Sequence, residues 1–212
     1  MMKTEKQINS LLYAIEKYPD IGRVKLMKFV FFVDLVMHNR RNETLLEDEY
    51  IRMQYGPVPA IAYTLTSQSN EYFSVAKVQI GNQRFQYVFK PLKSADCDLF
   101  SHEEKTVFDG VLDLLKRNTA VAISTLTHQF DLWKNVANGY RIPLDLFKLK
   151  EHELTEHHAE PFVMNDNVCD MELEKATAPP GVREVPVTAL LSERSLAKEW
   201  LKPEEDTAWD YL

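Results

Sequence analysis

The most apolar stretch of the chain lies at residues 24–37, where hydrophobic positions are almost continuous. Eleven of these fourteen residues are apolar, and the three exceptions are Lys25, Lys28 and Asp34. On a helical wheel the two lysines lie close together and Asp34 falls on roughly the opposite side, so apolar residues fill both flanks. The stretch is shorter and more charged than a membrane span, which needs about 20 mainly apolar residues. We therefore predict a central helix that other elements cover on most sides.

A second apolar stripe with helical spacing precedes this stretch. Thr4–Gln7 has the pattern of a capping box, which predicts a helix from about Lys6 to Tyr18. Its buried positions are expected to be Ile8, Leu11, Leu12 and Ile15. After the central stretch, the polar residues 38–42 predict a turn.

The segment Tyr55–Pro59 predicts a rigid break in the chain. Its two prolines fix φ, and Gly56 permits a backbone conformation that other residues resist. Pro59 suits the first turn of a short helix over about Ala60–Ser67.

One β-hairpin is predicted at about residues 72–90, where β-branched and aromatic residues flank a polar turn. Helices follow it. Ser101–Glu104 is a second capping box, and the helix behind it should bury Val107, Phe108, Val111, Leu112 and Leu115. Residues 119–137 predict two short helices with a turn between them, the second of which carries Trp133. Pro143 can open a last short helix.

The helical pattern stops near Lys150. Many acids and no sustained periodicity follow, and apolar spacing returns at about Ser192. We predict a mainly α fold class, with a compact helical domain over residues 1–150 that is built on the central buried helix and carries one β-hairpin insertion. An acidic linker at 151–191 and an extended or helical C-terminal tail at 192–212 should follow.

The charge of the chain divides at the same boundary. The net charge is -7, and residues 151–212 hold 15 acids and 5 bases, a balance of -10. The first 150 residues hold 17 acids and 20 bases, a balance of +3. An acidic tail does not suit the phosphates of nucleic acid, but it fits a basic protein surface.

No signal peptide or membrane span is evident, and the two cysteines lack metal-ligand spacing, which predicts a reduced, cytoplasmic protein with no membrane partner.

Few residue patterns point to catalysis. The six glycines are scattered singly, without a phosphate-binding loop, a nucleophile elbow or a dinucleotide fingerprint. His152 and His157 belong to a sequence like a zinc-protease motif, but they are five residues apart and would diverge by about 140° on a helix. A solvated polar segment explains them better. We expect no functional metal and no cofactor.

Two sets of residues in the body admit both a functional and a structural interpretation. His128 beside Trp133 could be a catalytic histidine with an aromatic wall, or a satisfied structural histidine beside a core tryptophan. We favour the structural role because no nucleophile stands out as a partner. Lys25 and Lys28 could mark a functional groove, or they could extend their apolar stems toward solvent. We therefore predict no catalytic residue and no enzyme.

The acidic tail carries the most distinctive candidate site. Trp200, Leu201, Trp209 and Leu212 are costly to leave exposed in a segment with few other apolar residues. They could fold back onto the body, remain disordered, or insert into a partner's groove while the acids meet basic residues around its rim. We favour the third interpretation, in which the acidic segment steers association toward a basic, nucleic-acid-handling protein.

Four motifs of the body follow one another in an order found in a known family. They are KLMKFVFF at 25–32, YGPV at 55–58, SHEE at 101–104 and LTHQFDLW at 126–133. Over about residues 5–150 the body resembles the Panacea domain of the SocA-like antitoxin and phage-associated protein family. The signature positions, which we interpret as structural, are Lys25, Phe29, Phe32, Tyr55, Gly56, Pro57, His128 and Trp133.

This resemblance implies a mostly helical domain in an antitoxin that is encoded beside its toxin and is not an enzyme. Family members are often joined to a variable segment that neutralises the toxin, and one branch is an adaptor that delivers its toxin to a protease. The tail in turn resembles the toxin-binding end of short bacterial antitoxins. That second resemblance covers Leu196, Ala197, Trp200, Pro203, Glu204, Glu205, Asp206 and Trp209, and Leu201 and Leu212 complete the predicted toxin-binding residues.

The expected function is that of an antitoxin which neutralises a protein toxin, encoded by a neighbouring gene, by direct binding through its tail. Two alternatives remain open. A proteolytic adaptor would have a protease as an additional partner. A DNA-binding autorepressor would bind through the body, which has a net charge of +3 and contains Arg40 and Arg41.

Overall fold

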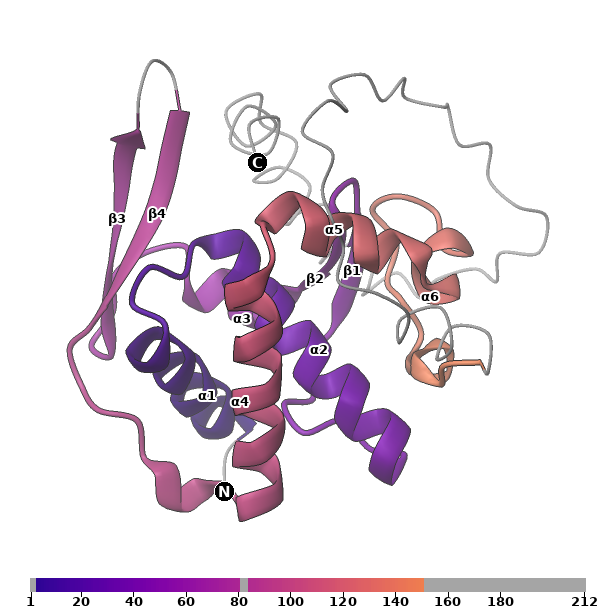
Figure 1. Cartoon of the computed structure of the whole chain (residues 1–212), viewed down its shortest axis with the longest axis horizontal. Coiled ribbons are helices and arrows are strands. Elements are labelled where there is room, and N and C mark those ends of the chain that lie inside the picture. Colours follow the sequence, from indigo (N-terminus) through magenta and orange to yellow (C-terminus); the bar gives the residue numbers. More distant parts are fainter. Residues whose placement is uncertain (1–2, 81–83, 151–212) are drawn as a thin grey trace.

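In the computed structural model, the long helix α2 (Arg23–Arg41) is the element on which the others assemble (Figure 1). It contacts both α1 (Lys3–Lys17) and α4 (His102–Arg117), and each of the two hairpins also contacts it. All residues from Leu26 to Leu35 are buried, including the charged Lys28 and Asp34. Each large apolar side chain buried in this way contributes about 1.5–3 kcal/mol. The predicted central helix, covered on most sides, is confirmed.

The structure describes residues 3–80 and 84–150, and shorter helices complete the fold there. They are α3 (Ala60–Leu65), η1 (Cys97–Leu99), α5 (Ala120–Gln129), α6 (Asp131–Lys134) and η2 (Leu144–Phe147). The predicted pair of short helices is confirmed as α5 and α6, and the short helix after Pro143 is the 3-10 turn η2. None of the described helices combines the length and apolar character needed to cross a membrane.

Aromatic side chains fill the core around α2. Phe31 packs against Tyr50 and Phe147 with ring centroids 5.7 Å apart in both pairs. Phe29 meets Phe108 of α4 edge to face at 5.4 Å. Such tilted and edge-on pairs add about 0.5–1.5 kcal/mol each beyond the burial of their area. The core therefore connects α2 both to α4 and to the C-terminal part of the body.

The start of α1 differs from the prediction. The helix already includes Thr4, so this residue lies inside it and does not cap it. Gln7, the other end of the supposed capping box, is buried, and its side-chain amide donates to the carbonyl oxygen of Leu46 at 2.8 Å. The capping-box prediction is wrong because a loop distant in sequence uses Gln7. The predicted stripe is confirmed, since Ile8, Leu11, Leu12 and Ile15 are all buried.

The end of α2 also lies beyond its predicted position. The helix continues through residues 38–41, where a polar turn was predicted, and it ends at Asn42. Asn42 has φ 60, and its N–H donates to the carbonyl oxygen of His38 at 2.8 Å. Asparagine tolerates this left-handed conformation better than most residues and closes helices in this way. His38 is buried and lies edge-on to Phe147, so packing sustains the additional turn.

A second hairpin replaces the predicted break around residue 57. Strand β1 (Tyr50–Met53) pairs antiparallel with β2 (Gly56–Pro59), so that Tyr50 lies opposite Pro59 and Met53 opposite Gly56. Prolines cannot donate to a β-ladder and are confined to edge strands, which is why a segment with two prolines did not suggest a strand. The fold therefore contains two hairpins where one was predicted.

The predicted hairpin is confirmed as β3 (Phe73–Ile80) and β4 (Arg84–Pro91), which stand at one side of the helices (Figure 1). β4 contacts α1 and α2. At the base of the hairpin Phe73 and Phe89 are buried and meet at 6.2 Å. Farther along the strands, Val78 is 43% exposed. The hairpin is thus anchored at one end and open to solvent toward the other.

Candidate functional site

Motifs that are distant in sequence meet where the β1–β2 turn contacts α2 and α5. We call this set of residues the turn junction, and it consists of Lys28, Tyr55, Gly56, Pro57, Thr127, His128 and Trp133. Lys28 comes from α2, the next three residues from the turn and the start of β2, and the last three from α5 and α6. Five of the predicted signature positions lie here. Of the other three, Phe29 and Phe32 are buried in the core, and Lys25 lies elsewhere on α2.

Lys28 connects α2 to the turn. Its side chain is 1% exposed, and Nζ donates to the carbonyl oxygens of Tyr55 at 2.8 Å and of Pro57 at 3.2 Å. Within the described part of the chain no carboxylate forms an ion pair with it, and burial lowers the pKa of Lys28 to about 7. The predicted extension toward solvent is wrong for Lys28, because backbone carbonyls inside the fold take up its N–H groups.

Lys25 lies differently. It is half-buried, and its Nζ donates to the hydroxyl of Tyr18 at 3.0 Å. Of the two lysines that the sequence placed side by side, only Lys28 reaches the turn junction. A helical wheel indicates which residues share a face, but it does not show which loop packs against that face.

Gly56 has almost no space around its Cα atom. Its φ is +108°, and a Cβ atom at this position would lie 2.2 Å from Nζ of Lys28 and 2.3 Å from Oγ1 of Thr127. Thr127 is buried and donates its hydroxyl to the carbonyl oxygen of Ser124 at 2.7 Å. The turn therefore requires glycine for two reasons, the positive φ and the close approach of α2 and α5.

His128 and Trp133 form a stacked pair beside the turn, with ring centroids 3.9 Å apart and planes inclined by 17°. The indole Nε1 donates to the carbonyl oxygen of Met53 at 2.9 Å, and the guanidinium of Arg52 lies 4.0 Å from the ring. Burial, and then the charges of Lys28 and Arg52, lower the pKa of His128 to about 4. The imidazole is therefore neutral at pH 7.

The environment of His128 differs from the expected satisfied histidine in one respect. A hydrogen bond connects the ring to the backbone of Gln54, but its Nε2 is buried and has no hydrogen-bond partner among the described residues. Trp133 is half-buried and lies at the edge of the core. The contacts of this pair connect α5 and α6 to β1, so the arrangement holds the first hairpin in place.

We predict that Lys28→Met changes the pH dependence of stability. The pKa of Lys28 is about 7 in the folded protein against an ordinary 10.5, so between these values the unfolded chain binds more protons. In the native protein the free energy of unfolding should therefore rise with pH across this window, by up to about 1.4 kcal/mol per pH unit from this group. The methionine variant should lack that increase, and urea unfolding at pH 7, 8 and 9 would measure it.

Lys25→Met is the matched control for this prediction. It removes a lysine from the same helix but leaves Lys28 and its two carbonyl partners intact. The control should therefore keep the native slope. If the free energy of unfolding rose equally with pH in the native protein and in Lys28→Met, Lys28 would not change its protonation between pH 7 and 9.

Two buried carboxylates position the loops around the first hairpin. Asp34 of α2 accepts hydrogen bonds from the N–H of Leu46 and the hydroxyl of Tyr50, both at 2.7 Å, and burial raises its pKa to about 7. Asp48 accepts from the N–H groups of Ile61 and Ala62 at 2.8 and 2.9 Å, at the start of α3. Burial raises the pKa of Asp48 to about 6. Asp34 of α2 and Asp48 of the following loop thus hold the segments that precede and follow the first hairpin.

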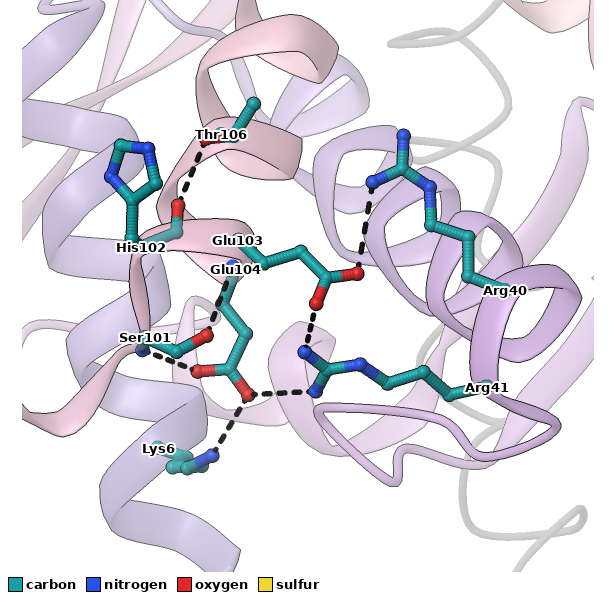
Figure 2. Close-up of polar contacts among 8 residues, drawn as sticks. All are labelled: Lys6, Arg40, Arg41, Ser101, His102, Glu103, Glu104 and Thr106. Atoms are coloured by element: carbon teal, nitrogen blue, oxygen red, sulfur yellow. Dashed lines mark hydrogen bonds and ion pairs between the residues drawn. The ribbon is translucent and has the colours of Figure 1, made fainter.

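A separate polar network joins the end of α2 to the start of α4 (Figure 2). Arg41 pairs with Glu103 and, at 3.8 Å, with Glu104, while Arg40 lies 3.9 Å from Glu103. Lys6 of α1 meets Glu104 at 3.4 Å. The alternative hypothesis of DNA binding was based on Arg40 and Arg41, and both residues face glutamates of the same domain. Their pairing reduces the positive field available to a phosphate backbone.

The same figure shows the start of α4, where the predicted capping box is confirmed (Figure 2). The N–H of Glu104 donates to Oγ of Ser101 at 3.2 Å, and the N–H of Ser101 donates to Oε2 of Glu104 at 2.7 Å. The five apolar residues predicted to be buried behind it are buried. Glu104 therefore caps α4 and pairs with Lys6 and Arg41.

The predicted toxin-binding residues of the segment 192–212 lie outside the described residues. The same is true of the acidic linker at 151–191 and of the metal-like pair His152 and His157. Their assignment as a binding segment, a linker and a solvated segment stays a prediction.

Comparison with known proteins identifies one family. The model described as antitoxin SocA-like, Panacea domain, matches residues 26–134, which is just over half of the chain. The match begins inside α2, ends with α6 and contains the whole turn junction. No curated protein matches the chain, and no solved structure matches it.

Proposed function

We propose that this chain, which belongs to the SocA-like antitoxin family through its Panacea domain, neutralises a protein toxin by binding it directly through residues 192–212. The family supports a role in a toxin–antitoxin system, in which such domains are generally not enzymes. The toxin would be encoded by a neighbouring gene, and binding would take place in the cytoplasm.

The observation that carries this proposal is the composition of the chain end. Residues 203–212 contain four acids and no base, together with Trp209, Tyr211 and Leu212. Large aromatic anchors dominate the binding energy of protein interfaces, and acids around them speed association with a basic partner. Just before these residues, the proposed binding segment offers Trp200 and Leu201 as further anchors.

The folded body suits the role of a carrier for this segment. The buried Lys28 is engaged with the backbone of the body, and the arginines at the end of α2 pair with glutamates of the body. The family match ends at residue 134, so the proposed binding segment lies outside the matched region. A shared body joined to a separate binding segment allows the toxin specificity to change without disturbing the core.

Coexpression with the product of the neighbouring gene tests the proposal. The full chain, residues 1–150 and residues 151–212 would each be expressed with a gene product that is toxic on its own. We expect the full chain and the fragment 151–212 to restore growth, and residues 1–150 to fail. Rescue by residues 1–150 alone would overturn the tail model and move the binding surface to the body.

Purified components separate direct binding from delivery to a protease. If the tail inhibits directly, the purified chain should suppress the activity of the purified toxin without any other protein. An adaptor would protect only where its protease is present.

A further inference from the structure

The β3–β4 hairpin has a charge pattern opposite to that of the chain end. Residues 72–93 contain four bases, Lys77, Arg84, Lys90 and Lys93, and no acid. The chain as a whole carries a net charge of -7, so this segment stands apart from its surroundings. Lys93 pairs with Glu71 at 2.5 Å, just outside the segment.

One face of the hairpin displays apolar side chains beside Lys90, whereas the register places Lys77 on the opposite face. Ala76 lies opposite Val88 and Ser74 opposite Lys90 in the antiparallel register, so these four residues share a face. Val78 projects from the same face, and Val78 and Val88 are 43% and 40% exposed. The alternate residues Phe73 and Phe89 point the other way and are buried in the body. We call this surface the outer hairpin face.

We propose that the outer hairpin face is a docking site for the acidic end of the same chain, residues 203–212. This segment has four acids, no base and three large apolar residues, whereas the hairpin segment has four bases and no acid. Each segment carries the charge that the other lacks, and on the outer hairpin face the exposed valines lie beside Lys90. Complementary charge of this kind favours association and suppresses wrong partners.

The chain has ample length for this contact. The described body ends at Lys150, and the 41 residues 151–191 could span about 140 Å when fully extended, which exceeds any dimension of a body this size. A segment tethered in this way has a high local concentration at the hairpin, so even weak charge and apolar contacts are populated.

The hairpin suits a peptide better than a nucleic acid. Binding to single-stranded nucleic acid relies on free aromatic faces on which bases stack. Here Nζ of Lys77 lies 4.8 Å from the ring of Phe85, and the guanidinium of Arg23 lies 3.6 Å from the ring of Tyr87. The outer hairpin face itself offers valines, which pack against apolar side chains.

Docking is a property of the free chain and is independent of any toxin. Where the toxin-binding role proposed above also holds, the docked end and the toxin compete for one segment, and that consequence rests on the proposed function. The docking itself is tested without toxin, so failure of one proposal does not entail failure of the other.

Photo-crosslinking of the full chain tests the docking. The photoreactive residue p-benzoylphenylalanine would replace Val88 on the outer hairpin face, and the products of irradiation would be mapped by mass spectrometry in nuclease-treated and untreated samples. The matched control places it at the exposed Gly110 of α4, where nothing lies within 4 Å of an added Cβ atom. We expect crosslinks from position 88 to residues 203–212 within one molecule, and none from position 110.

Charge reversal adds a second measurement on the same protein. Lys90→Glu should lower the yield from position 88 by about fivefold, as expected for the loss of one surface charge contact. Lys116→Glu, an equal change on α4, should leave the yield unchanged. Absence of crosslinks to residues 203–212, crosslinks between molecules, or a nucleic-acid adduct at position 88 would each overturn the proposal.

Discussion

Gly56→Ala is expected to lower the free energy of unfolding by about 3 kcal/mol or more, which is exceptional for the addition of one methyl group. Two independent costs combine at this position. The backbone has φ +108°, a conformation that costs a residue with a Cβ atom about 1–3 kcal/mol. The new Cβ atom would also lie 2.2 Å from Nζ of Lys28 and 2.3 Å from Oγ1 of Thr127, which is far inside contact distance.

The neighbouring atoms cannot move away at low cost. Lysine has a flexible side chain, but Nζ of Lys28 is buried and donates to the carbonyl oxygens of Tyr55 and Pro57. Moving it would leave buried acceptors without donors, at about 1–3 kcal/mol for each group. Thr127 is β-branched, fully buried and bonded to the backbone of Ser124. The substitution should therefore separate α2 and α5 from the turn.

Two other glycines provide matched controls for this prediction. Gly139 also has a positive φ, +83°, but nothing lies within 4 Å of its added Cβ atom, so Gly139→Ala should show the backbone cost alone. Gly110 lies inside α4 with open space around it, and Gly110→Ala should stabilise the protein by about 0.5–1 kcal/mol. Urea unfolding of all three variants gives the comparison. If Gly56→Ala lost no more stability than Gly139→Ala, the close approach of Lys28 and Thr127 would not matter.

The elements that could be predicted from sequence are those whose signals are local. The apolar run of α2, the capping box at Ser101 and the alternation in β3–β4 depend on residues a few positions apart, and the structure confirms all three. The first hairpin was missed because its second strand contains Pro57 and Pro59, which argue against a strand in most contexts. Its carbonyl groups find a donor on α2, and no pattern within the strand reveals that donor.

The candidate site shows the same limit. The motifs around Tyr55 and His128 could be identified as signature positions, and the fold brings them together. Which lysine of α2 reaches the turn could not be predicted, because Lys25 and Lys28 share one side of the helix and differ only in what packs against them. Asp48 gave no signal either, because its partners at Ile61 and Ala62 come from a different element.

Replacing both Trp200 and Trp209 with alanine is expected to abolish neutralisation of the toxin. Truncation of a tryptophan that anchors an interface typically costs about 2 kcal/mol or more, which corresponds to about 30-fold in affinity for each residue. Both residues lie in the proposed binding segment, outside the described residues, and none of the described core contacts around α2 involves them. Affinity would be measured by titration of purified toxin, and function by the recovery of growth on coexpression.

Two sets of control variants, one in the body and one at the acids of the tail, show whether the loss of neutralisation is specific to the tryptophans. Tyr140→Ala removes an aromatic residue of the body that is 38% exposed, and it should leave neutralisation unchanged. Neutral replacements of Glu204, Glu205 and Asp206 should mainly slow association and weaken its dependence on salt, because charges at the rim of an interface steer the encounter more than they hold the complex. Protection that survives the double tryptophan change would refute the anchors, and the binding surface would then have to lie on the body. Loss of protection in the double tryptophan variant, together with slower association but retained protection in the variants without the acids, would assign the affinity to the aromatic anchors and the association rate to the charges.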